Sequence, residues 1–176
     1  MIRNLQEKDI STCLDIYNWY IENTVITFEM EPLTLQSFTD RVHTITQRYP
    51  WLVLEEEGKI VGYAYLDVFN ARSAYDYTCD VSIYLDHTIQ GKGYGSKLMQ
   101  ALLDVAKEDG YHNAISIVTE GNQRSEKIHE KFGFEKVGFL PHTGYKFHTW
   151  LGVTYYQKTI QEGEPSKLKN KDYTCE

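Results

Sequence analysis

The residues that point most directly to chemistry are three alternating glycines, Gly91, Gly93 and Gly95, between an expected strand and an expected helix. Glycine has no Cβ atom, so the backbone can approach a ligand closely at these positions. The first N–H groups of the helix lack partners within it, and the helix dipole favours an anion at that end. We therefore expect a phosphate group to bind there, with added positive charge from Lys92 and Lys97.

The spacing of these glycines separates the loop from two other phosphate-binding loops. A Walker A loop requires Gly-x-x-x-x-Gly-Lys-Ser/Thr, and a Rossmann loop requires Gly-x-Gly-x-x-Gly. Here the pattern is Gly-x-Gly-x-Gly. A glycine-rich turn without a ligand remains the alternative, and three alternating glycines directly before a helix make it less favoured.

Hydrophobic periodicity indicates which elements position this loop. Before it, residues 77–85 alternate between apolar and polar, so that Asp80, Ser82 and Tyr84 share one face of a strand that can carry chemistry. After it, an amphipathic helix ends at Gly110, a C-terminal cap. The order is β-α-α-β-β-β-α-β-α-β-β, typical of an α/β layered fold. The other expected strands are 2–5, 51–55, 60–68, 114–118, 135–139 and 150–159, and the other helices follow Asp9, Thr34 and Asn122.

Length and charge limit the possible classes. A chain of 176 residues suits one domain, which we expect over residues 1–160, followed by a polar, mobile tail over 161–176. The net charge of -7 and the lack of a Lys/Arg stripe argue against a nucleic-acid partner. The sequence contains no apolar run of about eighteen residues, the length that would predict a membrane span. No signal peptide is evident either, so we expect a cytoplasmic protein.

The sequence predicts no metal site. Three cysteines are too few and too scattered for a zinc site or a disulfide framework. The histidines outside the motifs described below show no metal-ligand spacing either; they are His43, His87, His112, His142 and His148.

Two motifs, one after the other along the chain, resemble those of the GNAT acyltransferases. The first, Gln90-x-x-Gly93-x-Gly95, is similar to their pyrophosphate-binding signature, Arg/Gln-x-x-Gly-x-Gly/Ala. The second runs from Asn122-x-x-Ser125 to Gly133-Phe134 and resembles the segment that supports the pantetheine arm. Over residues 1–158 the chain resembles the phosphinothricin/methionine sulfoximine acetyltransferase branch. That likeness is carried by Ile26-Thr27-Phe28-Glu29, Gly62-Tyr63-Ala64-Tyr65, Ala71-Arg72, Val81-Ser82-Ile83-Tyr84 and Lys146-Phe147-x-x-Trp150-Leu151, among others.

The resemblance implies a GNAT fold. This is an α/β fold with a mixed, mostly antiparallel central sheet, helices on both faces, and central strands that splay apart to bind acetyl-CoA. It also implies a homodimer. The positions implied to contact acetyl-CoA are Ile83, Tyr84, Leu85, Gln90, Gly91, Lys92, Gly93, Tyr94, Gly95, Ser96, Asn122 and Lys131.

The resemblance further implies direct attack of a neutral amine on the thioester, without a covalent enzyme intermediate. A base must then take a proton from the ammonium, and a backbone N–H can stabilise the oxyanion. Asp80 is the candidate base, although the branch usually has Glu there; the shorter side chain would act through water. The alternative is a solvated or salt-bridged strand residue. His129 stands where many relatives have Tyr, and it could protonate the leaving thiolate or join a water relay, or simply pack or cap.

Substrate selection is expected from residues around the base. Arg72 could bind an α-carboxylate in bidentate fashion. Trp150 is favoured as a core residue rather than a ligand contact. The other positions expected to contact the substrate are Phe28, Glu29, Tyr75 and Lys146.

The favoured function is an acetyl-CoA-dependent N-acetyltransferase for a small amino acid or analogue, such as methionine sulfoximine or phosphinothricin. Two alternatives stay open. The acceptor could be a polyamine, an aminoglycoside or a protein N-terminus, or the chain could be a non-catalytic acyl-CoA sensor.

Overall fold

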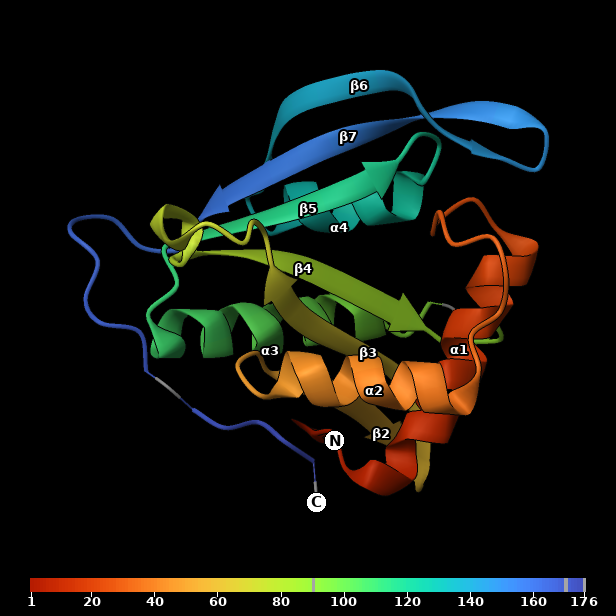
Figure 1. The fold of residues 1–176 in the computed structure, drawn as a ribbon, viewed down its shortest axis with the longest axis horizontal. Helices are drawn as coiled ribbons and strands as arrows, with labels where there is room; N and C mark the ends of the chain where they lie inside the picture. The colour runs from red at the N-terminus through yellow and green to blue at the C-terminus, as the bar shows by residue number, and fades with distance from the viewer. Residues whose placement is uncertain (90, 170, 176) are drawn as a thin grey trace.

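A seven-stranded sheet, ordered β1-β2-β3-β4-β5-β7-β6, forms the centre of the computed structural model, which describes residues 1–89, 91–169 and 171–175 (Figure 1). All neighbouring strands are antiparallel except β4 and β5, which are parallel. The strands are β1 (Ile2–Asn4), β2 (Trp51–Glu56), β3 (Lys59–Val68), β4 (Thr78–Leu85), β5 (Asn113–Thr119), β6 (Glu135–Lys146) and β7 (Thr149–Thr159).

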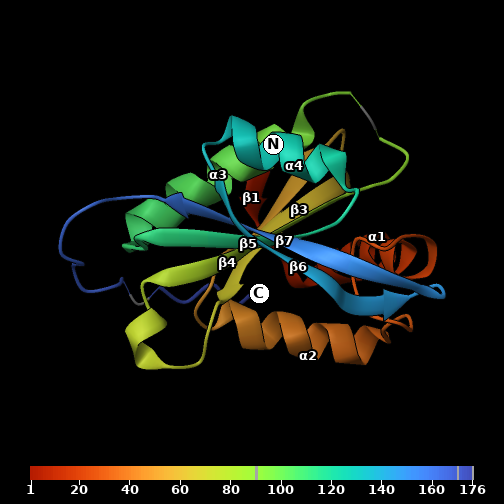
Figure 2. The same cartoon turned by 90° about the horizontal axis from the view of Figure 1, so that it is seen from above.

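Helices cover both faces of the sheet. Figure 2 shows α3 and α4 on one face and α1 and α2 on the other. The helices are α1 (Ile10–Asn23), α2 (Leu35–Thr46), α3 (Tyr94–Asp109) and α4 (Gln123–Lys131), with short 3-10 helices η1 (Glu7–Asp9) and η2 (Ser73–Tyr75). The expected mixed, mostly antiparallel α/β fold is confirmed.

The central strands β4 and β5 pair only over a short stretch. Three pairs join them, from Thr78 opposite Asn113 to Asp80 opposite Ile115. Both strands continue beyond these pairs, to Leu85 and Thr119, and they diverge as they do so (Figure 1). The sheet therefore opens into a wedge whose apex lies at Asp80.

Local sequence signals account for several of the boundaries. Glu57 and Gly58 both have positive φ and form the tight turn between β2 and β3. The Thr34 side chain accepts a hydrogen bond from the Ser37 N–H and caps α2. Gly110, in the left-handed region, ends α3 as predicted.

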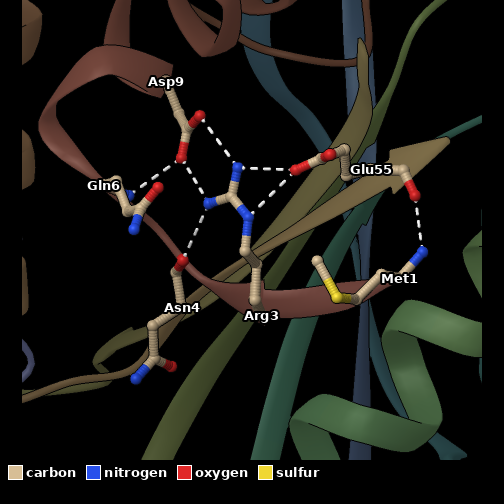
Figure 3. A network of polar contacts seen from close by, with 6 residues as sticks. All are labelled: Met1, Arg3, Asn4, Gln6, Asp9 and Glu55. Carbon is tan, nitrogen blue, oxygen red and sulfur yellow. Dashed lines mark hydrogen bonds and ion pairs between the residues drawn. The ribbon is translucent and has the colours of Figure 1, made fainter. Parts of the chain in front are cut away.

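The N-terminal strand is fixed by an arginine between two carboxylates (Figure 3). The Arg3 guanidinium lies 2.6 Å from an Asp9 carboxylate oxygen and 2.9 Å from Glu55. Asp9 also accepts a hydrogen bond from the Gln6 N–H at 2.9 Å. Asp9 thus precedes α1 as expected, but its carboxylate holds η1 and β1 instead of capping α1.

The hairpin of β6 and β7 differs from the sequence prediction in two ways. β6 continues to Lys146 rather than stopping at 139, with irregular pairing between Leu140 and Gly144. Pro141 breaks the alternating pattern there, but a proline is tolerated in an edge strand, which lacks a partner on one side. The expected core packing of Trp150 is wrong: its side chain is 58% exposed and contacts Tyr145.

Residues 161–169 and 171–175 form neither helix nor strand. They do contact the body of the protein: the Tyr173 N–H donates to the Thr46 carbonyl, and Lys171 Nζ lies 2.7 Å from Asp109. The domain boundary at 160 and the mobility of the tail stay predictions. Over the described part of the chain, no helix is long and apolar enough to cross a membrane.

Candidate active site

The wedge between β4 and β5 holds a cavity of about 320 Å³. Its walls come from both strands, from the N-terminal part of α3 and from α4, and α1 covers its outer side. The residues that line it include Tyr20, Ser82, Ile83, Tyr84, Leu85, Gly95, Ser116, Val118, Asn122, Arg124, Ser125 and His129. Arg124 was not expected here from the sequence, because its position in α4 carries no distinguishing pattern.

The backbone of β4 beyond Asp80 faces this cavity without a strand partner on the β5 side. The three residues expected to pair with a pantetheine arm, Ile83, Tyr84 and Leu85, all line the cavity. One of their groups is already used, because the Tyr20 hydroxyl donates to the Leu85 carbonyl at 2.9 Å. An extended, amide-bearing ligand can therefore add to this open strand edge by main-chain hydrogen bonds.

The glycine loop begins α3 as the sequence predicts. Gly91 and Gly93 have φ of 78° and 71°, a region that favours glycine, and Gly93 is the N-cap. Gly95 has a different role: a Cβ there would lie 2.9 Å from Ile128 Cδ1, so glycine lets α4 approach α3. The N–H groups of the first turn have no partner within the helix, which is the arrangement that suits an anion.

Positive charge reaches this helix end from α4. Lys131 Nζ donates to Ser96 Oγ at 3.1 Å, at the first turn of α3. Lys92 instead forms an ion pair with Glu56 at 3.0 Å. Tyr94 is buried, and its side chain belongs to the hydrophobic core. Gln90 lies outside the described residues, and its expected contact has no structural counterpart here.

His129 lies in the wall of the cavity and is 5% exposed. Its Nδ1 lies 2.7 Å from the Ser125 carbonyl and so carries a proton, while the buried Nε2 has no partner among the described residues. Burial lowers the pKa of His129. The ring is therefore neutral, with an acceptor lone pair on Nε2. Asn122 also lines the cavity, and its Oδ1 caps α4 through the Ser125 N–H.

Asp80 occupies the last paired position of β4, at the apex of the wedge. The pKa of Asp80 is raised to about 7, chiefly by burial. A hydrogen bond from the Val81 N–H lowers this pKa, and the nearby Asp67 carboxylate raises it. Asp67 is the residue directly opposite on β3. A carboxyl group that titrates near neutral pH is suited to proton transfer. The side chain is not among those lining the cavity, so a proton from a ligand there would pass through water.

A second group of expected residues gathers on the loop after α1. The buried Lys146 Nζ donates to the Thr27 carbonyl at 2.9 Å, and Gly144 packs so closely on Phe28 that a Cβ would clash with the ring. Glu29 pairs with Arg41 at 2.6 Å, and its other carboxylate oxygen is buried with no hydrogen-bond partner among the residues that the structure describes. This groups Phe28, Glu29 and Lys146 as expected; Arg41, on α2, was not foreseen.

The two residues expected on the loop between β3 and β4 are not gathered with the others. Arg72 and Tyr75 flank η2, and both are exposed. Neither lines the cavity of the wedge, and the Tyr75 ring contacts Phe69. The Arg72 side chain has solvent around it and is accessible to an incoming carboxylate.

Comparisons with known proteins agree with this geometry. Residues 13–134 match the acetyltransferase (GNAT) family. The phosphinothricin N-acetyltransferase of Streptomyces viridochromogenes is 34% identical over 166 residues, which cover 94% of this chain and 91% of the relative. The L-methionine sulfoximine/L-methionine sulfone acetyltransferase of Pseudomonas aeruginosa is 32% identical, covering 90% of this chain and 94% of the relative.

A solved structure shares the whole architecture. The phosphinothricin acetyltransferase of Sinorhizobium meliloti, determined in complex with acetyl-CoA, superimposes with a TM-score of 0.92 at 30% identity. The likeness covers 99% of this chain and 98% of that chain.

Proposed function

The chain belongs to the acetyltransferase (GNAT) family, and from this premise we propose that it acetylates the amine of a small amino acid or amino-acid analogue. It is an N-acetyltransferase that uses acetyl-CoA. The observation that carries the proposal is the cavity in the wedge of β4 and β5, with a carboxyl group of near-neutral pKa at its apex. The relatives named for phosphinothricin and methionine sulfoximine support the choice of acceptor.

The residues of the wedge fit acetyl-CoA, which supplies an activated thioester. The open edge of β4 at Ile83 and Tyr84 would pair with the amides of the pantetheine arm. The first turn of α3, with Lys131 beside it, would hold the pyrophosphate. Asn122 would add a side-chain contact. The unpartnered Nε2 of His129 supports a ligand donor in the cavity, since buried polar atoms are ordinarily paired.

Asp80 would take the proton from the substrate ammonium. At pH 7 roughly half of the Asp80 side chains are ionised, given a pKa of about 7, so the group can accept a proton and release it to solvent. Ser82 lies on the same face of β4 and lines the cavity, which supports a water relay between the amine and Asp80. Binding holds the amine and the thioester together, and this orientation contributes to the rate.

His129 would orient a bound group rather than protonate the leaving thiolate. Its Nδ1 proton is committed to the Ser125 carbonyl, and its lowered pKa keeps Nε2 unprotonated, so it has no proton to give a leaving thiolate. An acceptor at Nε2 can instead fix an amide N–H or a water. A CoA thiolate leaves readily without an acid.

For the acceptor, a free α-carboxylate would bind Arg72, whose side chain is exposed on the loop between β3 and β4. Tyr75 lies on the same loop as Arg72 and would contact the same part of the acceptor. Phe28, Glu29 and Lys146 form a separate group at the loop after α1 and would contact another part of the acceptor. A cationic acceptor, such as a polyamine or aminoglycoside, is the second candidate. The Glu29 carboxylate favours it, because one of its oxygens has no hydrogen-bond partner in the described part of the chain and would accept from an ammonium group.

We also propose that the enzyme is a cytoplasmic homodimer. The β6–β7 hairpin presents an apolar surface that a second copy would cover, as expected for a patch of this kind. Its exposed members are Val137, Phe139, Leu140, Tyr145, Phe147 and Trp150.

A panel of acceptors tests the function. Release of free CoA thiol would be followed with amino acids, methionine sulfoximine, phosphinothricin, polyamines and aminoglycosides, and with the decarboxylated form of each amino acid. We expect turnover with the amino-acid analogues and little with their decarboxylated forms. Equal rates for the two would refute the carboxylate requirement. Binding of acetyl-CoA without turnover of any amine would favour the sensor instead.

A further inference from the structure

A cluster far from the wedge brings together a carboxylate, an imidazole and a thiol. Glu7 comes from η1, His43 from α2, and Cys175 from the C-terminal segment. His43 Nε2 lies 2.9 Å from Glu7 Oε2, and Cys175 Sγ lies 3.3 Å from the same oxygen. All three ligand atoms lie within 4.8 Å of one another. From this geometry we propose that Glu7, His43 and Cys175 form a zinc site that fastens the C-terminal segment to the body of the protein.

The spacing of the three atoms suits a tetrahedral ion. With Zn–S near 2.3 Å and Zn–N and Zn–O near 2.0–2.1 Å, neighbouring ligand atoms of a tetrahedron lie roughly 3.3–3.6 Å apart. The two distances from Glu7 Oε2, 2.9 Å to His43 Nε2 and 3.3 Å to Cys175 Sγ, are slightly shorter than these values, and the third pair of atoms lies within 4.8 Å. The donor set of sulfur, nitrogen and oxygen favours zinc over magnesium or calcium, which prefer oxygen alone.

The site is accessible and its charges balance. The side chains of Glu7 and His43 are 51% and 45% exposed, so an ion can enter and water can fill a fourth position. On binding, the Cys175 thiol loses its proton to solvent, and the imidazole proton moves from Nε2 to Nδ1. The thiolate and the carboxylate then neutralise the two positive charges of the ion.

Contacts independent of any ion bring Cys175 to this place. The Tyr173 N–H donates to the Thr46 carbonyl at 2.9 Å, and its hydroxyl donates to the Asp109 carboxylate. Lys171 pairs with the same carboxylate at 2.7 Å. The third ligand is therefore held close to the first two before an ion arrives, which lowers the entropy lost on binding.

This proposal departs from the expectation of no metal, which considered only spacing along the sequence. Glu7 is 36 residues from His43 and 168 residues from Cys175 in the sequence, and folding brings them together. The site does not rest on the proposed acetyl transfer, so its failure would leave that function untouched.

Zinc binding by the full, reduced and metal-free chain tests the proposal. Competition against a chromogenic chelator should give one tightly held zinc ion per chain. Cys175→Ser and His43→Gln should each weaken binding by at least about 10–100-fold, the loss that even changes around the ligands produce. His142→Asn, which removes an exposed histidine of β6 outside the cluster, is the matched control and should bind as the wild type does.

Two further readouts separate this site from adventitious binding. Cobalt in place of zinc should give thiolate-to-metal absorption that disappears in Cys175→Ser, and zinc should raise the Tm of the wild type but not of that variant. The proposal is overturned if the wild type holds no zinc at micromolar concentrations. It is equally overturned if Cys175→Ser and His142→Asn bind zinc alike.

Discussion

Replacing Asp80 by Asn should stabilise the protein while it removes activity. Asp80 has a pKa near 7 in the folded protein against 3.8 for the free side chain. This difference in pKa corresponds to about 4 kcal/mol of unfavourable ionisation in the folded protein. The side chain is half-buried and water can reach it, which reduces this cost. We therefore expect Asp80→Asn to raise the free energy of unfolding by about 2–4 kcal/mol.

Proton binding determines how the stability of the wild type changes with pH. Between about pH 4 and pH 7 the folded state holds a proton on Asp80 that the unfolded state has lost. The free energy of unfolding therefore falls as the pH rises through this window, and it levels off above pH 7. Asn binds no proton, so the difference in stability between Asp80→Asn and wild type should grow from pH 4 to pH 7 and stay constant beyond it.

Two measurements check this prediction. Urea unfolding of both proteins across that pH range gives the difference in unfolding free energy. Thiol release gives kcat, which should fall by about 10²–10⁴ on loss of a general base. In wild type, the rate should rise with pH through an apparent pKa near 7, and the variant should lack this rise. A pH-independent stability difference would refute the burial argument, and an unchanged pH–rate profile would refute the role as base.

Three other substitutions test the cavity, the anion site and the hairpin surface. Gly62→Ala should lower the unfolding free energy by about 1–3 kcal/mol, because its Cβ would lie 2.9 Å from the Tyr84 carbonyl oxygen and 3.3 Å from Leu85 Cα, backbone atoms of β4 beside the cavity. Urea unfolding checks this, and a loss below measurement error would contradict it. Lys131→Ala should raise KM for acetyl-CoA several-fold with kcat little changed, by removing a charge at the first turn of α3. Steady-state kinetics at two salt concentrations measure this, and an unaltered KM would argue against the pyrophosphate site. Trp150→Asp should yield a monomer in sedimentation velocity without loss of folding, because the indole is 58% exposed. A dimer that persists would place the contact elsewhere.

The sequence allowed much of the fold to be predicted, because its local signals agree with the tertiary structure. Turn glycines such as Gly58 and caps such as Thr34 and Gly110 lie where the backbone requires them. The hairpin of β6 and β7 was harder to predict. Pro141 interrupts the pattern of β6, and Trp150, an apolar residue that normally indicates a core, is exposed.

The sequence suggested which residues form the candidate site but could not show their interactions. The spacing of the glycines predicts an anion site at the start of α3, yet it could not show that Gly95 serves the packing of α4. Nor could it show that Lys92 is paired with Glu56 while Lys131 reaches Ser96. Such pairings depend on which side chains the sheet brings together, and these come from distant parts of the chain.

The position of Asp80 connects the architecture to the chemistry. A carboxylate deeper in the sheet would stay protonated at neutral pH, and one on the open part of the wedge would stay ionised. The pairing of β4 with β5 ends at Asp80, so this residue has sheet around it on one side and the wedge on the other. Its pKa of about 7 follows from this intermediate environment, with Asp67 opposite it adding a further rise. A strand pairing one residue longer should bury the carboxylate more and move its pKa higher, away from the range useful for accepting a proton. By this argument the length of the β4–β5 pairing sets the pKa of the Asp80 carboxyl group, and with it the fitness of Asp80 for the proposed role as base.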